Sequence, residues 1–187
     1  MALVNILFRL LKRERPQQSS VVKIIPDIEL LTVQTPSEPK TFLYPAPNLY
    51  SRIRVDGKPV GSVDYGLNPL EDRVYIHKID IAPEYQRRGY ALAALALIAA
   101  EHKIPIIPVH IWGFAIGFWS KARSHLQALG FEIGPEIRCS QLNEEAARWQ
   151  HLVPEPEHER LIREYWVWVE GERAAGRPAG PAIKMQS

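Results

Sequence analysis

The stretch from Val74 to His102 reads VYIHKIDIAPEYQRRGYALAALALIAAEH and contains three local patterns in direct succession. Its first eight residues are rich in β-branched and aromatic side chains, which is typical of a strand. Ala82-Pro83 ends that strand, and the alanine- and leucine-rich run from Tyr90 to His102 is typical of a helix. A short basic turn, Glu84 to Gly89, separates the strand from the helix.

The basic turn is a candidate anion site. A helix that begins directly after a turn presents several unpaired backbone N–H groups, and the positive end of the helix dipole reinforces them. Arg87 and Arg88 add positive charge, and Gly89 allows close approach because it has no Cβ. The sequence therefore predicts an anion site here, most naturally for phosphate. A surface Arg-Arg pair in an ordinary strand-to-helix turn is the alternative interpretation.

The amino-acid sequence of the turn distinguishes it from two common phosphate-binding loops. Gln86 to Ala91 reads QRRGYA, which lacks the Lys-Ser/Thr ending of a P-loop and the three spaced glycines of a dinucleotide fingerprint. It resembles the Q/R-x-x-G-x-G/A signature of the GNAT superfamily of acetyl-CoA-dependent N-acetyltransferases. The preceding residues, Ile79 to Tyr85, resemble the strand and the Pro-Glu shoulder that commonly lead into that loop.

A second resemblance lies further along the chain. GNAT sequences often run N-x-x-A-x-x-x-Y-x-x-x-G-F across a later helix, and Ala122, Gly130 and Phe131 match that spacing. The Asn position is occupied by Trp119 and the Tyr position by Leu126. These two departures bear on the mechanism, because the tyrosine usually supplies the proton for the leaving thiolate.

The resemblance implies an α/β (α+β) fold: a GNAT-like mixed, mostly antiparallel central sheet flanked by helices, with N- and C-terminal extensions. It also implies acetyl-CoA as cofactor, with CoA as product and no metal. The backbone of Ile79 and Ile81 would bond the pantetheine arm, and the N–H groups from Arg87 to Ala91 would hold the pyrophosphate. The full set of cofactor-binding residues implied in this way is Ile79, Asp80, Ile81, Gln86, Arg87, Arg88, Gly89, Tyr90, Ala91 and Trp119.

The candidate catalytic bases are His77 and Tyr75 on the central strand, with His110 near the end of the next strand as a further candidate. Tyr75 lies where several relatives carry a catalytic glutamate, but a tyrosine does not readily replace a carboxylate at neutral pH. A histidine can take up a proton near neutral pH, so His77 is considered first. A buried, structurally satisfied histidine is the alternative. Leu126 cannot act as an acid, and the thiolate can leave without help.

Two functions follow from these residues. The first is an N-acetyltransferase that uses acetyl-CoA and a primary amine, on a small-molecule or protein acceptor. The second is a catalytically silent CoA-binding or protein-interaction module on a GNAT scaffold, favoured by Leu126 and by the missing Asn. Both predict cofactor binding, and only the first predicts release of CoA when an amine is supplied.

Before the central strand, short apolar runs predict further strands at Val21–Ile25, Ile28–Val33, Leu49–Val55 and Pro59–Tyr65, with Asp56-Gly57-Lys58 as a hairpin turn. Four prolines between Thr35 and Asn48 argue against a helix there. The irregular alternation of apolar residues in Val74–Ile81 predicts a β-bulge. After the helix we expect a strand over Ile104–Ile111, a helix over Ala115–Leu129 closed by Gly130, and a strand from Phe131.

The two ends of the chain are expected to be extensions. Residues 1–20 form an amphipathic, basic segment that could pack on this domain or a second copy, lie at a membrane interface, or remain a loose tail. Residues 21–140 are the expected GNAT-like core and 141–175 a C-terminal helical extension. Within it, Glu157–Ala175 is read as a helix, with a strand at Tyr165–Val169 as the alternative. A flexible tail is expected over 176–187.

Composition is that of a soluble globular protein of one domain, with 187 residues, 46% hydrophobic and 24% charged. The net charge of +2 gives no reason to expect a nucleic acid partner. No run is long and apolar enough to span a membrane, and a single cysteine, Cys139, fits a reducing, cytoplasmic setting. A membrane partner is not expected, and a homodimer is considered.

Overall fold

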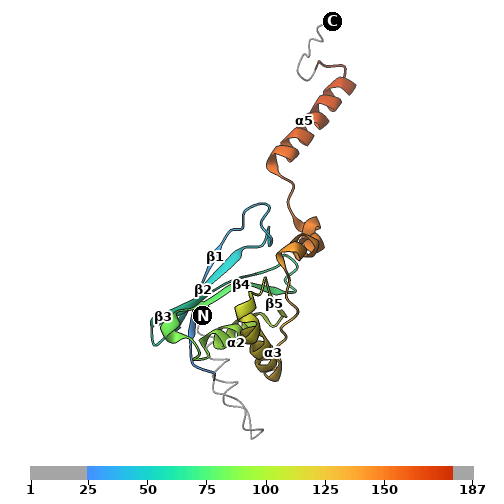
Figure 1. Cartoon of the computed structure of the whole chain (residues 1–187). Helices are drawn as coiled ribbons and strands as arrows, with labels where there is room; N and C mark the ends of the chain where they lie inside the picture. The colour runs from blue at the N-terminus through green and yellow to red at the C-terminus, as the bar shows by residue number, and fades with distance from the viewer. Residues whose placement is uncertain (1–24, 179–187) are drawn as a thin grey trace. The chain divides into compact units, whose positions relative to one another are not determined.

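The computed structural model of the chain describes residues 25–178 of the 187 (Figure 1). The expected amphipathic segment at 1–20, most of the expected strand at Val21–Ile25 and residues 179–187 of the expected tail lie outside the described residues. The chain divides into two compact units between Leu152 and Val153.

The first unit contains a five-stranded sheet with the strands in chain order. The first four strands form three antiparallel pairs, and the fifth strand is parallel to the fourth. This confirms the predicted mixed, mostly antiparallel sheet. The strands are β1 (Glu29–Thr35), β2 (Asn48–Val55), β3 (Lys58–Leu67), β4 (Val74–Ile81) and β5 (Ile106–Pro108).

Helices of the first unit follow β4 and β5. The predicted limits of β4 and of the following helix, Tyr90–His102, are both confirmed. The α-helices are α2 (Tyr90–His102), α3 (Ile116–Ala128) and α4 (Leu142–Ala146), and the 3₁₀ turns are η1 (Pro83–Tyr85), η2 (Gly113–Ala115), η3 (Cys139–Gln141) and η4 (Ala147–Leu152). Gly130 has φ of 85° after α3, which confirms its expected left-handed conformation.

The hairpin between β2 and β3 turns at Asp56-Gly57, whose φ angles are 49° and 76°. Val55 and Lys58 are paired across it, so the loop has two residues, both in the left-handed region that such turns need. The chain between β1 and β2 contains turns and no helix, as its prolines predict.

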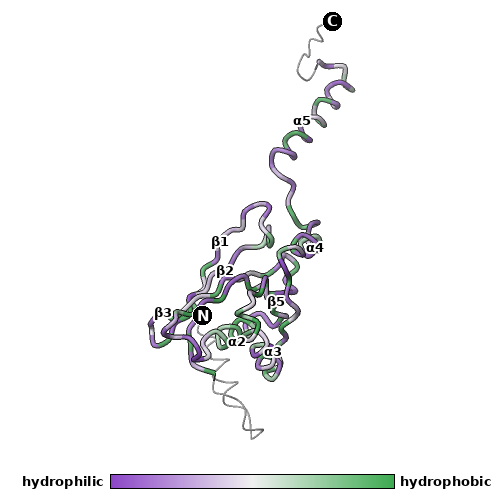
Figure 2. Tube along the Cα trace, viewed as in Figure 1, coloured by the Kyte–Doolittle hydropathy of each residue, from purple (hydrophilic) through white to green (hydrophobic). Residues whose placement is uncertain are grey.

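The main core lies between one face of the sheet and α2. Residues Ala93 to Ala100 of that helix are all buried, and small alanines let the helix approach the sheet closely. Figure 2 shows the predominantly hydrophobic character of this helix. Side chains from β2, β3 and β4 that meet α2 and α3 include Ile53, Val60, Val63, Tyr65, Val74 and Ile76.

A second hydrophobic cluster contains Tyr75 and Ile107, which alternate along their strands with residues of the main core. Leu43 from the β1–β2 connection and Trp149 from η4 complete it, and both are 1% exposed. Trp149 lies nine residues beyond the expected end of the core at residue 140. The compact unit therefore extends to Leu152, because this aromatic side chain fills the cluster.

Two predicted strands differ from what the structure shows. The expected strand Ile104–Ile111 is reduced to Ile106–Pro108, because Pro105 and Pro108 interrupt it. No regular strand begins at Phe131. That segment contributes two isolated bridges instead, Ile133 to Ile106 and Ile137 to Val109.

His102, at the end of α2, carries a buried imidazole nitrogen, Nε2, with no hydrogen-bond partner among the described residues. Burial lowers the pKa of His102, and the nearby Glu101 opposes that shift. The unfolded chain therefore binds this proton more tightly than the folded chain, so the protein has its full stability above about pH 6.5 and loses part of it as pH falls through the lower folded-state pKa of His102.

His102→Leu should flatten the dependence of unfolding free energy on pH between neutral and mildly acid conditions, without loss of stability at pH 7. Denaturant unfolding at several pH values measures this. His151→Leu is the control, because it makes the same substitution at an exposed histidine in η4, and it should leave the slope as it is. A pH slope unchanged in His102→Leu contradicts the assignment.

The second unit contains α5 (Glu157–Ala174). The helical interpretation of this segment is confirmed, and the alternative strand is wrong. Figure 2 shows hydrophilic and hydrophobic residues alternating along α5. Arg163 forms a two-pronged ion pair with Glu155, with donor–acceptor distances of 3.1 and 2.7 Å. Among residues 25–178, no helix is both long enough and apolar enough to cross a bilayer.

Candidate functional site

His77 lies at a β-bulge in β4. Lys78 pairs with Asp64 on β3, but the next pair is Ile76 with Tyr65, so His77 is the extra residue. Val74 and Ile76 before it, and Ile79 and Ile81 after it, all contact the main core. Residues 77 and 78 are thus two consecutive residues directed away from that core, which confirms the predicted bulge.

Beyond the bulge, β4 and β5 separate. The parallel pairing covers only Val74, Tyr75 and Ile76 of β4, and the Val109 amide closes it by donating to the Ile76 carbonyl at 3.0 Å. From Lys78 to Ile81 the strand is paired with β3 on its other edge. Within the described part of the chain, the edge of β4 toward β5 therefore pairs with no strand along Ile79 to Ile81, where the resemblance places the pantetheine arm, and the Ile81 carbonyl accepts from the Gln86 side chain.

The turn after β4 gathers unpaired N–H groups. Arg87 and Gly89 have φ of 59° and 85°, in the left-handed region, and Gly89 is the N-cap of α2 without a side-chain cap. The Ala93 amide donates to the Gly89 carbonyl at 2.9 Å and begins the helical bonding. Within residues 25–178, the amides from Arg87 to Leu92 donate to no acceptor outside the helix. This arrangement is typical of an anion-binding concavity.

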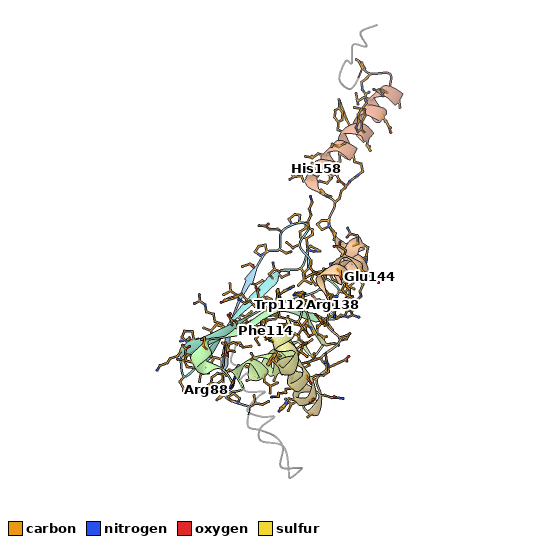
Figure 3. All side chains as sticks on the ribbon, viewed as in Figure 1. Arg88, Trp112, Phe114, Arg138, Glu144 and His158 are labelled. Atoms are coloured by element: carbon orange, nitrogen blue, oxygen red, sulfur yellow. The ribbon has the colours of Figure 1, made fainter. Side chains whose placement is uncertain are left out.

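The side chains of the turn have different tasks. The Gln86 amide donates to the Ile81 carbonyl at 2.9 Å and closes the turn. Arg88 donates to the Glu84 carbonyl at 2.9 Å, and its guanidinium lies 5.6 Å from the centre of the Tyr85 ring. Figure 3 shows Arg88 at the periphery of the first unit. Arg87 is exposed and forms no hydrogen bond or ion pair with the described residues, so its charge is available to an anion.

His77 is half-buried, and its ring centre lies 6.2 Å from that of Phe42 in the β1–β2 connection. Burial lowers its pKa below the ordinary value, and the carboxylate of Asp64 opposes that shift. His77 is therefore neutral at pH 7 and able to accept a proton. The structure places it at the point where β4 and β5 begin to separate.

Tyr75 is fully buried, and its hydroxyl donates to Glu145 Oε1 at 2.5 Å. Burial, together with this bond, raises the pKa of Tyr75 well above its ordinary value. Glu145 also accepts from Arg73 at 2.7 Å and from Arg148 at 2.8 Å, so four groups form one network. The catalytic assignment of Tyr75 stays a prediction, and these surroundings favour a structural role.

The remaining predicted residues are distributed between surface and core. Asp80 is exposed and lies 3.7 Å from Lys78 in an ion pair. Tyr90 and Ala91 are half-buried in the first turn of α2, beside the unpaired amides. Trp119, at the family's Asn position, is 6% exposed and belongs to the main core. Leu126, at the Tyr position, is fully buried in the same core.

The connection from β5 to α3 carries His110, the further candidate base, and two exposed aromatic residues, Trp112 and Phe114, to which the sequence interpretation gave no role. His110 has φ of 51° and stacks edge-on against Trp112, with ring centres 4.7 Å apart. Trp112 and Phe114 are 63% and 89% exposed, and both are labelled in Figure 3. The sequence signal for this exposed pair is the dense aromatic run directly after a strand that pairs with β4.

A comparison with protein families agrees with this geometry. The sequence model described as "Acetyltransferase (GNAT) family" matches residues 9–103, which is half of the chain and includes β4, the turn and α2. The chain belongs to the GNAT family. Acetyltransferase activity and use of acetyl-CoA are general in this family. A comparison with curated proteins found no match.

The GNAT match ends one residue after α2. The later helix, with Trp119 and Leu126 at its two departing positions, lies outside it. In residues 25–178 no three His, Cys, Asp or Glu side chains are grouped as metal ligands.

Proposed function

We propose that this GNAT protein transfers an acetyl group from acetyl-CoA to a primary amine of a small-molecule or protein acceptor. The observation that carries the proposal is the separation of β4 from β5 directly before a turn with unpaired amides. The exposed free thiol of Cys139 supports a reducing, cytoplasmic location.

The residues present suit acetyl-CoA. The open edge of β4 along Ile79 to Ile81 would bond the amide groups of the pantetheine arm. The amides from Arg87 to Ala91 would hold the pyrophosphate, with the Arg87 guanidinium as a charge-assisted donor. Gln86 and Arg88 hold the turn in shape through the Ile81 and Glu84 carbonyls. When bound, the cofactor supplies an acetyl group activated as a thioester.

The protein's own chemical task is removal of a proton from the acceptor amine. An amine attacks only with a free electron pair, so its ammonium form must first lose a proton. Neutral His77, at the bulge, can accept it directly or through one water molecule. Its ring lies beside Phe42, so the β1–β2 connection forms one wall of this region.

The second candidate is a catalytically silent CoA-binding or interaction module. The observation that favours it is the burial of Trp119 and Leu126, which occupy core volume where the family often has Asn and Tyr. Leu126 has no proton to give to a leaving thiolate. In the enzymatic alternative the thiolate leaves unassisted with the electrons of the broken C–S bond, because a thiol of fairly low solution pKa gives a stable thiolate, and solvent can protonate it afterwards.

Thermal unfolding with acetyl-CoA tests what both functions share. Ligand at about 100 times its dissociation constant should add roughly 2.7 kcal/mol, or several degrees in Tm. Release of free thiol across a panel of primary amines then separates them, because only an acetyltransferase consumes acetyl-CoA. The absence of any shift in Tm with acetyl-CoA or CoA removes both functions.

The glycine of the turn gives a sharper test of the cofactor site. Gly89→Val should raise the dissociation constant of acetyl-CoA by about 10-fold or more, because a β-branched residue does not adopt φ of 85° and the amides would no longer converge. Isothermal titration calorimetry measures the constant.

Gly130→Val is the matched control, since Gly130 has the same φ of 85° at the end of α3. Both variants should lose about 1–2 kcal/mol of stability from the backbone conformation. Only Gly89→Val should weaken cofactor binding. Equal affinities in the two variants contradict the placement of the pyrophosphate.

A further inference from the structure

The outer edge of β1 is the free edge of the sheet in the part of the chain that the structure describes. β1 pairs with β2 from Glu29 to Thr35 without a register shift, and no strand of the described residues lies on its other side (Figure 1). Such an edge leaves a row of N–H and C=O groups ready to bond another strand. Proteins usually prevent such pairing with a bulge, a proline or a lysine in the edge strand, or by keeping that strand very short. β1 has seven residues and none of these devices.

One face of this edge also carries a small apolar patch, with Arg52 beside it as the cross-strand partner of Leu31. Leu30 and Thr32 face the helix side, where Leu30 contacts the main core and Thr32 Oγ1 lies 2.6 Å from Ser51 Oγ. Leu31 and Val33 alternate with them, so they lie on the opposite face, and they are 38% and 59% exposed. Tyr50, the cross-strand partner of Val33, is 41% exposed beside them. This patch therefore runs to the strand edge.

From these features we infer that a second copy of the chain binds here, with the two β1 strands antiparallel about a two-fold axis at Thr32. In that register all seven residues are paired, and Leu31 lies opposite the partner's Val33. The four apolar side chains of the two copies then form one cluster, which continues the sheet across both copies. Because the interface is isologous, it closes as a dimer.

Other registers fit less well. Opposed residues of antiparallel strands must lie on the same face, so the axis must pass through a residue. An axis at Leu31 would set Glu29 opposite the partner's Val33 and place a charge against the apolar cluster. An axis at Val33 would leave Glu29 and Leu30 unpaired. The axis at Thr32 sets Glu29 opposite Thr35, and Glu29 already has Arg54 as its cross-strand neighbour.

Sedimentation velocity of the full chain over about a 100-fold range of concentration should show a monomer–dimer equilibrium. The double substitution Leu31→Lys and Val33→Lys should raise the dissociation constant at least about 100-fold, because four like charges would meet in the cluster. Phe114→Lys is the control, since Phe114 is 89% exposed elsewhere, and it should leave the equilibrium unchanged. A chain that is monomeric throughout the range overturns the proposal.

Cross-linking tests the register without altering the apolar patch. In a Cys139→Ser background, which removes the only native cysteine, Thr32→Cys should form a disulfide-linked dimer. Directly opposed residues have Cα atoms about 4.5–5.5 Å apart, within disulfide range. Gln34→Cys is the matched control on the same face, because its two copies would lie about 13 Å apart. A dimer that persists in the lysine variant and fails to cross-link through Thr32→Cys overturns the proposal and places the interface elsewhere.

Discussion

His77→Gln should lower kcat for acetyl transfer by about 100- to 10,000-fold, the usual contribution of a positioned general base. His77 lies at the bulge where β4 leaves β5, and burial keeps its pKa low, so the neutral imidazole is available at pH 7. Glutamine preserves a polar side chain but does not accept a proton near neutral pH. Acetyl-CoA affinity should stay near that of the wild type, because the amides of the turn are untouched.

The pH profile gives an independent measurement of the same role. Activity of the wild type should fall only as pH drops below the ordinary histidine pKa of about 6.5, because the folded-state pKa of His77 lies lower. That acid limb should be absent from the residual activity of His77→Gln.

Two further variants serve as controls for His77. His151→Gln makes the same change at an exposed position in η4 and should retain full turnover. Tyr75→Phe should also retain turnover if Tyr75 is structural, since Glu145 keeps its two arginine partners. Wild-type turnover in His77→Gln, with normal acetyl-CoA binding, would dismiss His77 as the base. A fall of about 100-fold or more in Tyr75→Phe would instead assign chemistry to Tyr75.

Trp149→Ala should cost about 3–5 kcal/mol of unfolding free energy, the usual effect of removing a large buried aromatic side chain. Trp149 is 1% exposed, and its ring centre lies 5.5 Å from that of Phe42 and 6.2 Å from that of Tyr75. Its removal would leave a cavity between η4, the β1–β2 connection and β4. At roughly 2–4 °C per kcal/mol, Tm should fall by about 6–20 °C.

Trp168→Ala is the matched control for Trp149. Trp168 is 54% exposed on α5 in the second unit, so its loss should leave the unfolding of the first unit unchanged. Differential scanning calorimetry compares the two variants. A Trp149→Ala protein that unfolds at the wild-type Tm would show that residues 141–152 are not part of the folded core. The expected boundary at residue 140 would then be the better description.

Local sequence patterns were sufficient to predict the conformation of a segment where its own residues decide that conformation. The limits of β4 and α2 followed from β-branched residues, then Pro83, then an alanine-rich run. The Asp56-Gly57 turn and the left-handed Gly130 followed in the same way, since few residues tolerate positive φ. The bulge was predictable because an even alternation could not bury both Ile76 and Ile79 on one face.

The sequence by itself therefore determined the central strand, the turn and the helix, and with them the GNAT family and the expected cofactor site. The tertiary structure alone decided what depends on residues distant in the chain. Glu145, 70 residues from Tyr75, engages that hydroxyl, and Trp149 extends the core beyond the expected boundary. Likewise, the short pairing of β5 and the free edge of β1 depend on which strands meet. Strand pairing and burial are non-local, whereas turns and helix starts are set by neighbouring residues.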